Sequence, residues 1–321
     1  FPFYVKKYKI VQVSAYNKKT LNPYTGGTPM NMWTEDLVLP EELRKERLQK
    51  EPASYTAWIL GKSGKTQEKK RKAVIICPGG GYEHLSPREG EPIAMKYLAM
   101  GYHVFVLHYS LAPERFPTAL RELALLTAKI REHADEWRID SEGIIVSGFS
   151  AGGHLALSLG VHWDKEWLSG PLGLTPEQIR PNGLILCYPV VTAGEGCHRG
   201  SVERLLWGQM LTEEEQMIPE RGMEEKEMLR ELISLEKQVG SHTPPVFLWH
   251  TVTDQTVPVR NALVLAEALI KSGVSLELHL YPVGRHGLAL ATEETADGQE
   301  SNIEPQCQSW IVLAEKWLEH F

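Results

Sequence analysis

Short apolar runs alternate with amphipathic segments along most of the chain. The runs with the length and the β-branched or aromatic content of strands are 54–60, 73–77, 103–109, 143–147, 183–188, 246–249 and 276–281. Segments with apolar residues at helical spacing are 92–100, 118–137, 154–159, 259–272 and 310–320. The run 73–77 contains no polar residue, which is typical of a strand buried on both faces. This order predicts the α/β class, with a mainly parallel central sheet and helices on both of its faces.

Two segments depart from this alternation. Residues 61–72 are polar and contain glycine, so we interpret them as a hairpin-like connection between the first two strands. The stretch 195–240 contains no strand pattern, and its parts 203–217 and 224–237 are charged, amphipathic and helical. A helical insertion at this point would lie over the carboxyl edge of the sheet, where a lid is expected. The alternative is a helix packed on the flank of the sheet with a solvated surface excursion.

Length, composition and charge narrow the classes of function. At 321 residues, one domain over 1–321 is the default. The chain is 42% hydrophobic and has nine tryptophans, which is enough for a sizeable core. Its formal net charge is -7, so no basic face is available to neutralise phosphates. We therefore expect a small-molecule substrate and neither a nucleic-acid nor a membrane partner, while the oligomeric state is left open.

The four cysteines, Cys77, Cys187, Cys197 and Cys307, lack the spacing of a metal site. We interpret them as free thiols in a reducing compartment, with Cys77 and Cys187 inside buried strands. No apolar run approaches the about 18 residues of a membrane span, and no signal-peptide pattern is present. We expect a cytoplasmic location, although the chain begins at Phe1 and earlier removal of a signal peptide is compatible with the sequence.

The sequence Gly148-Phe149-Ser150-Ala151-Gly152 lies between a predicted strand and a predicted helix. A G-x-S-x-G pattern in that context is typical of a serine nucleophile, whose Oγ projects above the sheet from a sharp, strained turn. The residues two before and two after the serine approach neighbouring backbone closely, so they must be small. The N-terminus of the following helix favours negative charge. We therefore predict that Ser150 is a nucleophile.

A serine is a weak nucleophile and needs a base. The chain order for this fold is serine, then an acid, then histidine. Asp254 and His286 each follow a predicted strand, in loops at the same sheet edge as Ser150. We predict that His286 is the general base and that Asp254 orients it and stabilises its imidazolium form. The alternatives are a helix N-cap for Asp254 and a surface loop position for His286.

Charge that develops on a substrate carbonyl oxygen needs hydrogen-bond donors already in place. In this fold they come from the residue after the nucleophile, here Ala151, and from the loop after the third strand, here the glycine run 79–81. Glycines let the backbone turn its N–H groups toward one point without an obstructing Cβ, whereas Pro78 has no N–H. We predict an oxyanion hole made by Gly80, Gly81 and Ala151.

Other polar residues near these motifs have weaker signals. Tyr82, Glu83 and His84 follow the glycine run and are candidates for lining the substrate entrance. His154 lies one turn after Ser150, and we expect it to pack or hydrogen-bond beneath the site. The histidines interpreted as core residues of strands are His108, His250 and His279. We predict no metal site, because no spacing of residues suggests one. The glycine run lacks the Lys-Ser/Thr of a phosphate-binding loop, and the predicted chemistry requires no cofactor.

With these motifs, the chain resembles the acetyl esterase and acetylxylan-esterase-like branch of the α/β-hydrolases, close to the hormone-sensitive-lipase-like carboxylesterases. The matching segments are 78–82, 109–113, 148–154, 254–258 and 281–287. The lipase-like relatives have histidine before the glycines, where this chain has Pro78, and this departure favours the acetyl-esterase branch. The resemblance implies the α/β-hydrolase fold and a short acyl group, such as acetyl, on a carbohydrate or a small alcohol. Such families vary at 195–240, so the acyl pocket is not carried over.

The predicted function is hydrolysis of carboxylic esters through an acyl-enzyme, with Ser150, His286 and Asp254 as the triad. A small amidase, a formamidase or a peptidase would use the same triad. A prolyl-peptidase-like enzyme would usually add a large N-terminal propeller, for which the residues before the glycine run are too few. A non-catalytic binding protein on this scaffold would typically lack a triad member, whereas all three are present in order.

Overall fold

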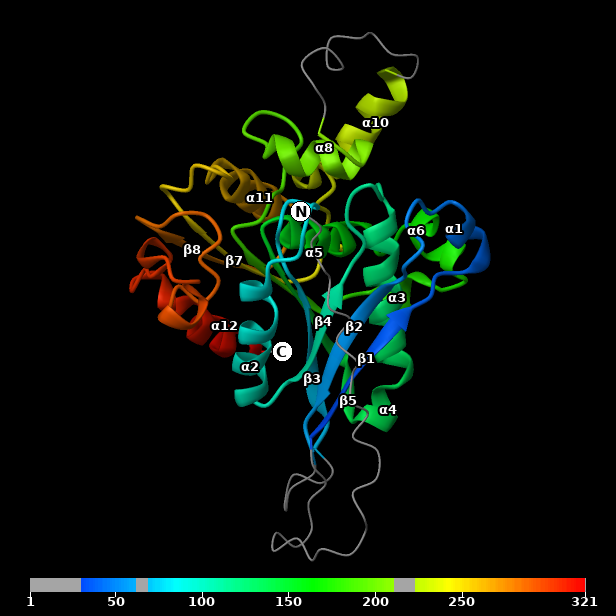
Figure 1. Ribbon diagram of the computed structural model, residues 1–321, viewed down its shortest axis with the longest axis horizontal. Helices are drawn as coiled ribbons and strands as arrows, with labels where there is room; N and C mark the ends of the chain where they lie inside the picture. Colours follow the sequence, from blue (N-terminus) through cyan, green and yellow to red (C-terminus); the bar gives the residue numbers. More distant parts are fainter. Residues whose placement is uncertain (1–29, 62–68, 211–222, 321) are drawn as a thin grey trace, which may run out of the picture.

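The computed structural model describes residues 30–61, 69–210 and 223–320. Its centre is an eight-stranded sheet with the order β1-β2-β4-β3-β5-β6-β7-β8 (Figure 1). The strands are β1 Asn31–Leu37, β2 Ala53–Ile59, β3 Arg71–Cys77, β4 His103–His108, β5 Ile139–Phe149, β6 Gly183–Cys187, β7 Val246–Thr251 and β8 Leu276–Tyr281. Strands β3 to β8 are parallel, and β1 and β2 pair antiparallel at one edge. The predicted α/β class with a mainly parallel sheet is therefore confirmed.

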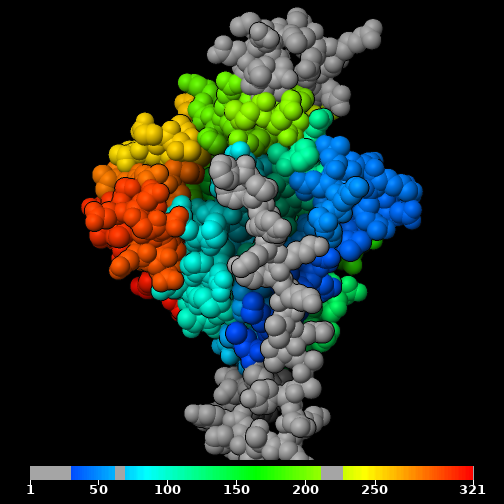
Figure 2. Space-filling model, in the orientation of Figure 1, coloured from blue at the N-terminus to red at the C-terminus, as the bar shows by residue number. Residues whose placement is uncertain are grey.

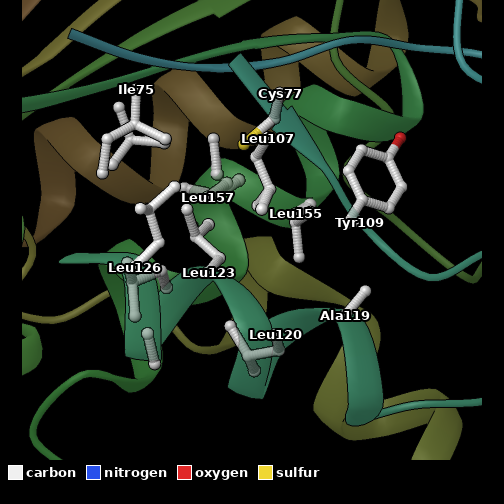
Figure 3. Packing of buried hydrophobic residues seen from close by; sticks show 14 of the residues in the cluster. Ile75, Cys77, Leu107, Tyr109, Ala119, Leu120, Leu123, Leu126, Leu155 and Leu157 are labelled. Carbon is white, nitrogen blue, oxygen red and sulfur yellow. The ribbon is translucent and has the colours of Figure 1, made fainter. Parts of the chain in front are cut away.

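Helices cover both faces of this sheet, because side chains alternate along each strand. In β3, Ile75 belongs to one apolar cluster, while Val74 and Ile76 belong to the other. The helices of the first cluster are α3 Thr118–Glu132, α5 Ala151–His162 and α11 Arg260–Lys271. Those of the second are α2 Glu91–Ala99 and α12 Trp310–Leu318. Figure 3 shows the first cluster, in which leucines of α3 and α5 face side chains of β3 and β4.

The remaining helices are short or lie in the insertion. They are α1 Glu41–Lys45, α4 Ala134–Trp137, α6 Glu166–Ser169, α7 Pro176–Ile179, α8 Arg199–Trp207 and α10 Met223–Ile233. Helices α8 and α10 come from the predicted insertion and lie together at one end of the molecule (Figures 1 and 2). Helix α8 ends at Gly208, whose φ of 71° suits glycine, so it stops earlier than the predicted segment 203–217. Residues 211–217 of that segment lie outside the described residues.

Three elements of the structure differ from the sequence prediction. Strand β2 does not form a hairpin with β3: β4 and β5 occupy both edges of β3, so β2 pairs with β4 instead. Strand β1 was not predicted, because it is an edge strand whose side chains are mostly exposed and therefore do not need an apolar pattern. The predicted long helix 118–137 is divided into α3 and α4 at His133, whose ψ of 12° is not helical.

The cysteines are free, as predicted, and Cys77, Cys187 and Cys307 are buried while Cys197 is half-buried. Burial raises the pKa of the Cys77 and Cys187 thiols, which keeps them protonated. Among the described helices, none combines the length and the apolar content that a bilayer span requires.

A buried carboxyl group in α3 fastens the loop after β4. Glu122 Oε2 accepts from Ser110 N–H at 2.8 Å, and Oε1 accepts from the Ser110 hydroxyl at 2.5 Å and from Arg47 Nη1 at 3.2 Å. Burial raises the pKa of Glu122 from 4.5 to about 7, with a further contribution from Glu114, although the bonds from Ser110 and the charge of Arg47 oppose this rise. The folded protein therefore binds a proton at Glu122 more tightly than the unfolded chain does.

We expect Glu122 to make the protein less stable as the pH rises. The folded-state pKa lies above the unfolded value, so the contribution of Glu122 is complete below about pH 4.5 and is lost as the pH rises through about 7. The loss is on the order of 3 kcal/mol. Urea unfolding at about pH 5 and about pH 8 measures it, with Glu122→Gln as the uncharged comparison. An unchanged pH dependence in Glu122→Gln would contradict this expectation.

Candidate active site

The loops with the predicted functional residues meet at the carboxyl edge of the sheet. After β3 the chain moves toward one edge through β4, and it then returns to form β5 on the other side of β3. The loops after β3 and β5 therefore diverge, which creates the crevice where open α/β sheets bind ligands. The glycine run 79–81 follows β3, and Ser150 follows β5. Strand order thus brings together two segments that are about 70 residues apart in the chain.

Ser150 lies on a strained turn between β5 and α5. Its φ of 52° and ψ of -117° are unusual for a residue with a side chain, and such strain is typical of functional sites. A Cβ at Gly148 would lie 2.2 Å from Gly152 O, and one at Gly152 would lie 2.1 Å from Cys77 O. Both contacts are impossible, so these positions need glycine, as the sequence pattern predicts.

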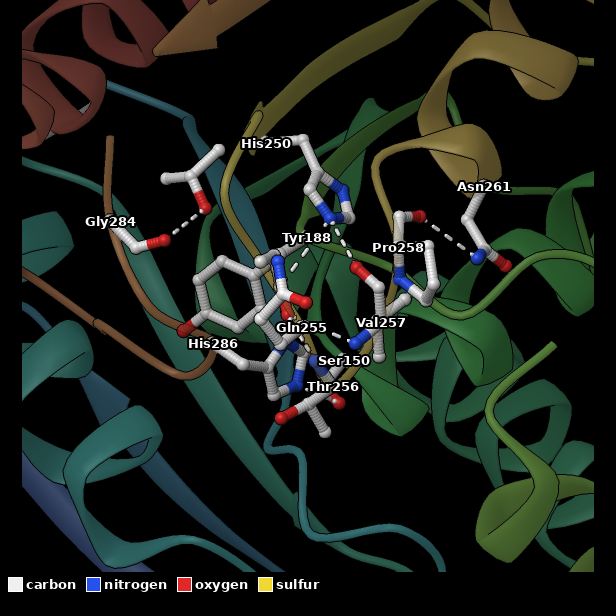
Figure 4. Close-up of polar contacts among 12 residues, drawn as sticks. Ser150, Tyr188, His250, Gln255, Thr256, Val257, Pro258, Asn261, Gly284 and His286 are labelled. Atoms are coloured by element: carbon white, nitrogen blue, oxygen red, sulfur yellow. Dashed lines mark hydrogen bonds and ion pairs between the residues drawn. The ribbon is translucent and has the colours of Figure 1, made fainter. Parts of the chain in front are cut away.

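A hydrogen-bonded chain connects Ser150, His286 and Asp254, as Figure 4 shows for the first two. Ser150 Oγ lies 2.8 Å from His286 Nε2, and His286 Nδ1 lies 2.6 Å from Asp254 Oδ2. An ionised carboxylate only accepts, so Nδ1 has the proton and Nε2 is free to accept from the serine hydroxyl. The three residues come from the loops after β5, β7 and β8. This arrangement can withdraw a proton from Ser150.

Asp254 is fixed on both of its oxygens. Oδ1 accepts from the backbone N–H groups of Thr256 and Val257, each at 2.9 Å, and Oδ2 faces His286. Burial by itself would raise the pKa of this carboxyl group, but bonds from His250 and His286 and the charge of His286 lower it well below its usual value. Asp254 is therefore an anion that can stabilise a protonated His286.

His250 is a core histidine that also contacts the loop of Asp254. Its Nε2 lies 2.9 Å from Val257 O and 3.4 Å from Asp254 Oδ2. A carbonyl oxygen only accepts, so Nε2 has the proton. Our interpretation of His250 as a core residue is therefore incomplete: it is fully buried, but it also holds the Asp254 loop (Figure 4). The other two strand histidines, His108 and His279, are only half-buried and bond to Thr56 and Glu277.

Hydrogen bonds within the loop after β3 hold the backbone of the glycine run. Ser86 N–H donates to Gly79 O at 2.9 Å, and Glu83 N–H donates to Gly80 O at 3.0 Å. In a trans peptide the C=O and the next N–H point in opposite directions, so these bonds fix the directions of the Gly80 and Gly81 N–H groups. Glycine is needed at Gly80, because φ is 127° and a Cβ would lie 2.0 Å from a carbonyl oxygen.

The third predicted donor is the N–H of Ala151, the first residue of α5. It has no acceptor within its helix, because the first N–H groups of a helix lack partners in the preceding turn. By contrast, Gly79 N–H donates to Glu89 Oε2 at 2.8 Å and is therefore occupied. Gly80 and Gly81 line the same pocket as Ser150, so their N–H groups and that of Ala151 stay the predicted oxyanion donors.

A pocket of about 370 Å³ opens over Ser150. Its lining residues are Gly80, Gly81, Glu83, His84, Ser86, Arg88, Glu89, Ser150, His198, Arg204, Thr256, Arg285, His286 and Gly287. Within the described part of the chain, this lining includes no leucine, isoleucine, valine or methionine and no aromatic side chain except histidine. Arg204 Nη2 and Glu83 Oε2 form an ion pair at 2.7 Å, which fastens α8 to the loop after β3.

The structure separates the three candidates for the substrate entrance. Glu83 and His84 line the pocket, as expected. Tyr82 does not: it is buried, and its hydroxyl lies 3.0 Å from His154 Nδ1, beneath the glycine run. The expectation for Tyr82 was therefore wrong, because its φ of 59° turns its side chain inward while its neighbours face the pocket. His154 also lies 2.9 Å from Ile233 O, which agrees with its predicted structural role.

Several residues that line the pocket were not predicted from the sequence. Thr256 and Arg285 are within two residues of Asp254 and His286, so proximity in sequence could have found them. His198 and Arg204 belong to the insertion, and only the packing of α8 over Gly81 brings them to the site. Burial, together with the charges of His286 and Arg204, lowers the pKa of His198, which favours its neutral form.

One family model and several known proteins are similar to this chain. The family model described as BD-FAE matches residues 62–269. Endo-1,4-beta-xylanase B of Butyrivibrio fibrisolvens is 35% identical over 233 residues, 71% of this chain and 34% of that protein. The acetylxylan esterase of Xylanibacter ruminicola is 28% identical over 225 residues, 69% of this chain and 42% of that protein. The chain thus spans less than half the length of these two relatives.

A solved structure matches nearly end to end. The acetyl ester-xyloside bifunctional hydrolase of Caldicellulosiruptor lactoaceticus is 32% identical, with a TM-score of 0.72, and the match covers 90% of this chain and 96% of that one. At this similarity the two chains share the overall fold.

Proposed function

This chain belongs to the BD-FAE family of α/β-hydrolases, and we propose that it is a serine carboxylic-ester hydrolase acting on acetyl esters of carbohydrates or small alcohols. The observation that carries the proposal is the hydrogen-bonded chain from Ser150 through His286 to Asp254. Such a chain activates a hydroxyl for attack on a carbonyl carbon. In this proposal the backbone N–H groups of Gly80, Gly81 and Ala151 bind the oxyanion that this attack creates, and Gly80 and Gly81 line the same pocket as Ser150.

The proposed reaction has two steps that conserve atoms and charge. Ser150 Oγ bonds to the carbonyl carbon as its proton passes to His286 Nε2, and the carbonyl oxygen becomes an anion held by the backbone donors. The carbon–oxygen bond to the alcohol then breaks, and His286 returns the proton to the departing oxygen. A water molecule then attacks the acyl carbon as one of its protons passes to His286 Nε2. The bond from that carbon to Ser150 Oγ breaks, His286 returns the proton to Oγ, and the acid is released.

The lining of the pocket supports a small acyl group and a polar alcohol. Arginine, glutamate, histidine and hydroxyl groups suit the hydroxyls of a sugar, whereas the described lining has no large aliphatic side chain against which a long acyl chain could pack. The names of two relatives, an acetylxylan esterase and an acetyl ester-xyloside hydrolase, support the same class of substrate. We therefore propose acetylated xylose-containing carbohydrates as the first natural substrates to test.

We expect kcat/KM to be highest for the shortest esters. For nitrophenyl acetate, butyrate and octanoate, the value should fall by about tenfold or more from acetate to octanoate, because the described lining offers the added methylenes no large aliphatic side chain to pack against. The uncatalysed rate of each ester is the control. Equal turnover of acetate and octanoate would contradict the acetyl preference. Inertness toward every ester, with cleavage of a formamide or an anilide, would favour the amidase alternative instead.

A further inference from the structure

A buried carboxyl group lies directly behind the oxyanion loop, and the reaction above does not use it. Glu89 ends the short 3-10 helix η2 (Pro87–Glu89), and only 2% of its surface is exposed. Its hydrogen-bond partners are both neutral: Gly79 N–H donates to Oε2 at 2.8 Å, and the Tyr188 hydroxyl donates to Oε1 at 2.7 Å. Burying a carboxyl group among neutral partners is costly, so its position requires an explanation.

One oxygen of Glu89 holds the start of the oxyanion loop against the nucleophile. A Cβ at Gly79 would lie 2.7 Å from Glu89 Oε2 and 3.0 Å from Ser150 Cβ, so this backbone is confined between the two side chains. The Gly79 C=O and the Gly80 N–H belong to one peptide plane. Any shift of Gly79 therefore changes the direction of the first oxyanion donor.

The other oxygen of Glu89 reaches the loop that contains His286. The Tyr188 oxygen, which donates to Glu89, also accepts from Ala289 N–H at 2.9 Å. The Tyr188 ring lies 5.1 Å from the His286 ring, at 72° to it, and Figure 4 shows the two rings side by side. Tyr188 and Ala289 both have positive φ values, of 38° and 53°. Two strained residues are thus joined by one hydrogen bond beside the general base.

We propose that Glu89 and Tyr188 are positioning residues that fix the oxyanion donors relative to His286. The bridge runs from Gly79 N–H through the Glu89 carboxylate and the Tyr188 hydroxyl to Ala289 N–H. Neither residue bonds to the reacting atoms. Their effect on rate rests on the proposed ester hydrolysis, in which the oxyanion and the imidazolium form together.

The chemistry of the bridge explains why a carboxylate occupies this position. Gly79 N–H can only donate, and the Tyr188 oxygen already accepts from Ala289, so its proton is free to donate. A residue between them must therefore accept at both ends, which a carboxylate does. A glutamine keeps the shape of Glu89 but has one acceptor oxygen only, so it cannot accept from both Gly79 N–H and the Tyr188 hydroxyl.

The test compares Glu89→Gln, Tyr188→Phe and the double variant on nitrophenyl acetate. Each single variant should lower kcat by roughly 10- to 100-fold, less than the loss of a whole oxyanion donor, with KM nearly unchanged. A trifluoromethyl ketone that adds to Ser150 should bind more weakly by a similar factor, because it needs the same donors. The double variant should be no slower than the slower single variant, since both break one bridge.

Matched controls separate positioning from damage to the fold. Glu122→Gln and Tyr97→Phe alter a buried carboxyl and a buried hydroxyl away from the pocket, and both should retain the wild-type kcat. If Glu89→Gln unfolds at the assay temperature, Tyr188→Phe still tests the bridge, since it removes one hydroxyl only. A wild-type kcat in Glu89→Gln or Tyr188→Phe, or independent losses that multiply in the double variant, overturns the inference. Wild-type protein inert toward all esters would instead refute the proposed function.

Discussion

Replacement of Ser150 by alanine is expected to lower kcat for nitrophenyl acetate by about 10⁶-fold. In the proposed reaction the hydroxyl oxygen bonds to the carbonyl carbon, and it lies 2.8 Å from His286 Nε2, the proposed base. KM should change little, because the pocket walls and the backbone donors remain. The residual rate would come from the oxyanion donors acting on water.

The Ser150→Ala result is only informative if the fold is intact. Thermal unfolding of the variant should match the wild type closely, because alanine keeps the Cβ of Ser150 and loses only the hydroxyl with its bond to His286. A fluorophosphonate reagent gives a second readout: it should add its mass to the wild-type protein and leave Ser150→Ala unlabelled. Labelling of the variant, or retention of more than about 1% of kcat, would assign the nucleophile to another residue.

Replacement of Asp254 by asparagine is expected to lower kcat by about 10⁴-fold while the shape of the site is kept. The carboxylate accepts at both oxygens, from Thr256 and Val257 at Oδ1 and from His286 at Oδ2. An amide oxygen will remain with the two backbone donors, so the amide NH₂ will face His286. The ring must then accept at Nδ1 and place its proton on Nε2, which can no longer accept from Ser150.

Kinetics of Asp254→Asn on nitrophenyl acetate, with Asp140→Asn as the control, test this tautomer argument. Asp140 Oδ1 also accepts from a backbone N–H two residues ahead, Glu142, but it lies at the start of β5, far along the strand from Ser150. The control should keep the wild-type kcat. If Asp254→Asn loses less than about tenfold, the N-cap alternative for Asp254 would be the better description.

The local motifs could be predicted from the sequence, because each is a short segment whose residue types indicate its backbone conformation. Ser150 lies between two glycines that the backbone requires, and Gly80 and Gly81 take positive φ values directly after a buried strand. Asp254 and His286 follow strands in the order expected for this fold. Such signals depend on a few neighbouring residues, so no knowledge of the strand order was needed to find them.

Contacts between residues that are distant in the sequence could not be predicted in this way. Glu89 and Tyr188 are 99 residues apart and meet only because η2 and the end of β6 lie on the same side of the crevice. His198 and Arg204 reach the pocket through the packing of α8 over Gly81. The inward turn of Tyr82 and the additional contact of His250 with Asp254 also depend on neighbours that are distant in sequence.

The sequence by itself determined the class of the fold, and it was enough to propose the nucleophile, its two partners and the backbone donors, because periodicity and turn chemistry act over a few residues. Tertiary structure alone decided that β4 lies between β2 and β3, that α8 closes one wall of the pocket and that Glu89 joins the two catalytic loops. These features follow from which strand edges pair and which faces are buried together. The pairing of strand edges and the burial of faces minimise the free energy of the whole sheet and its helices, so they cannot be predicted from any short segment alone.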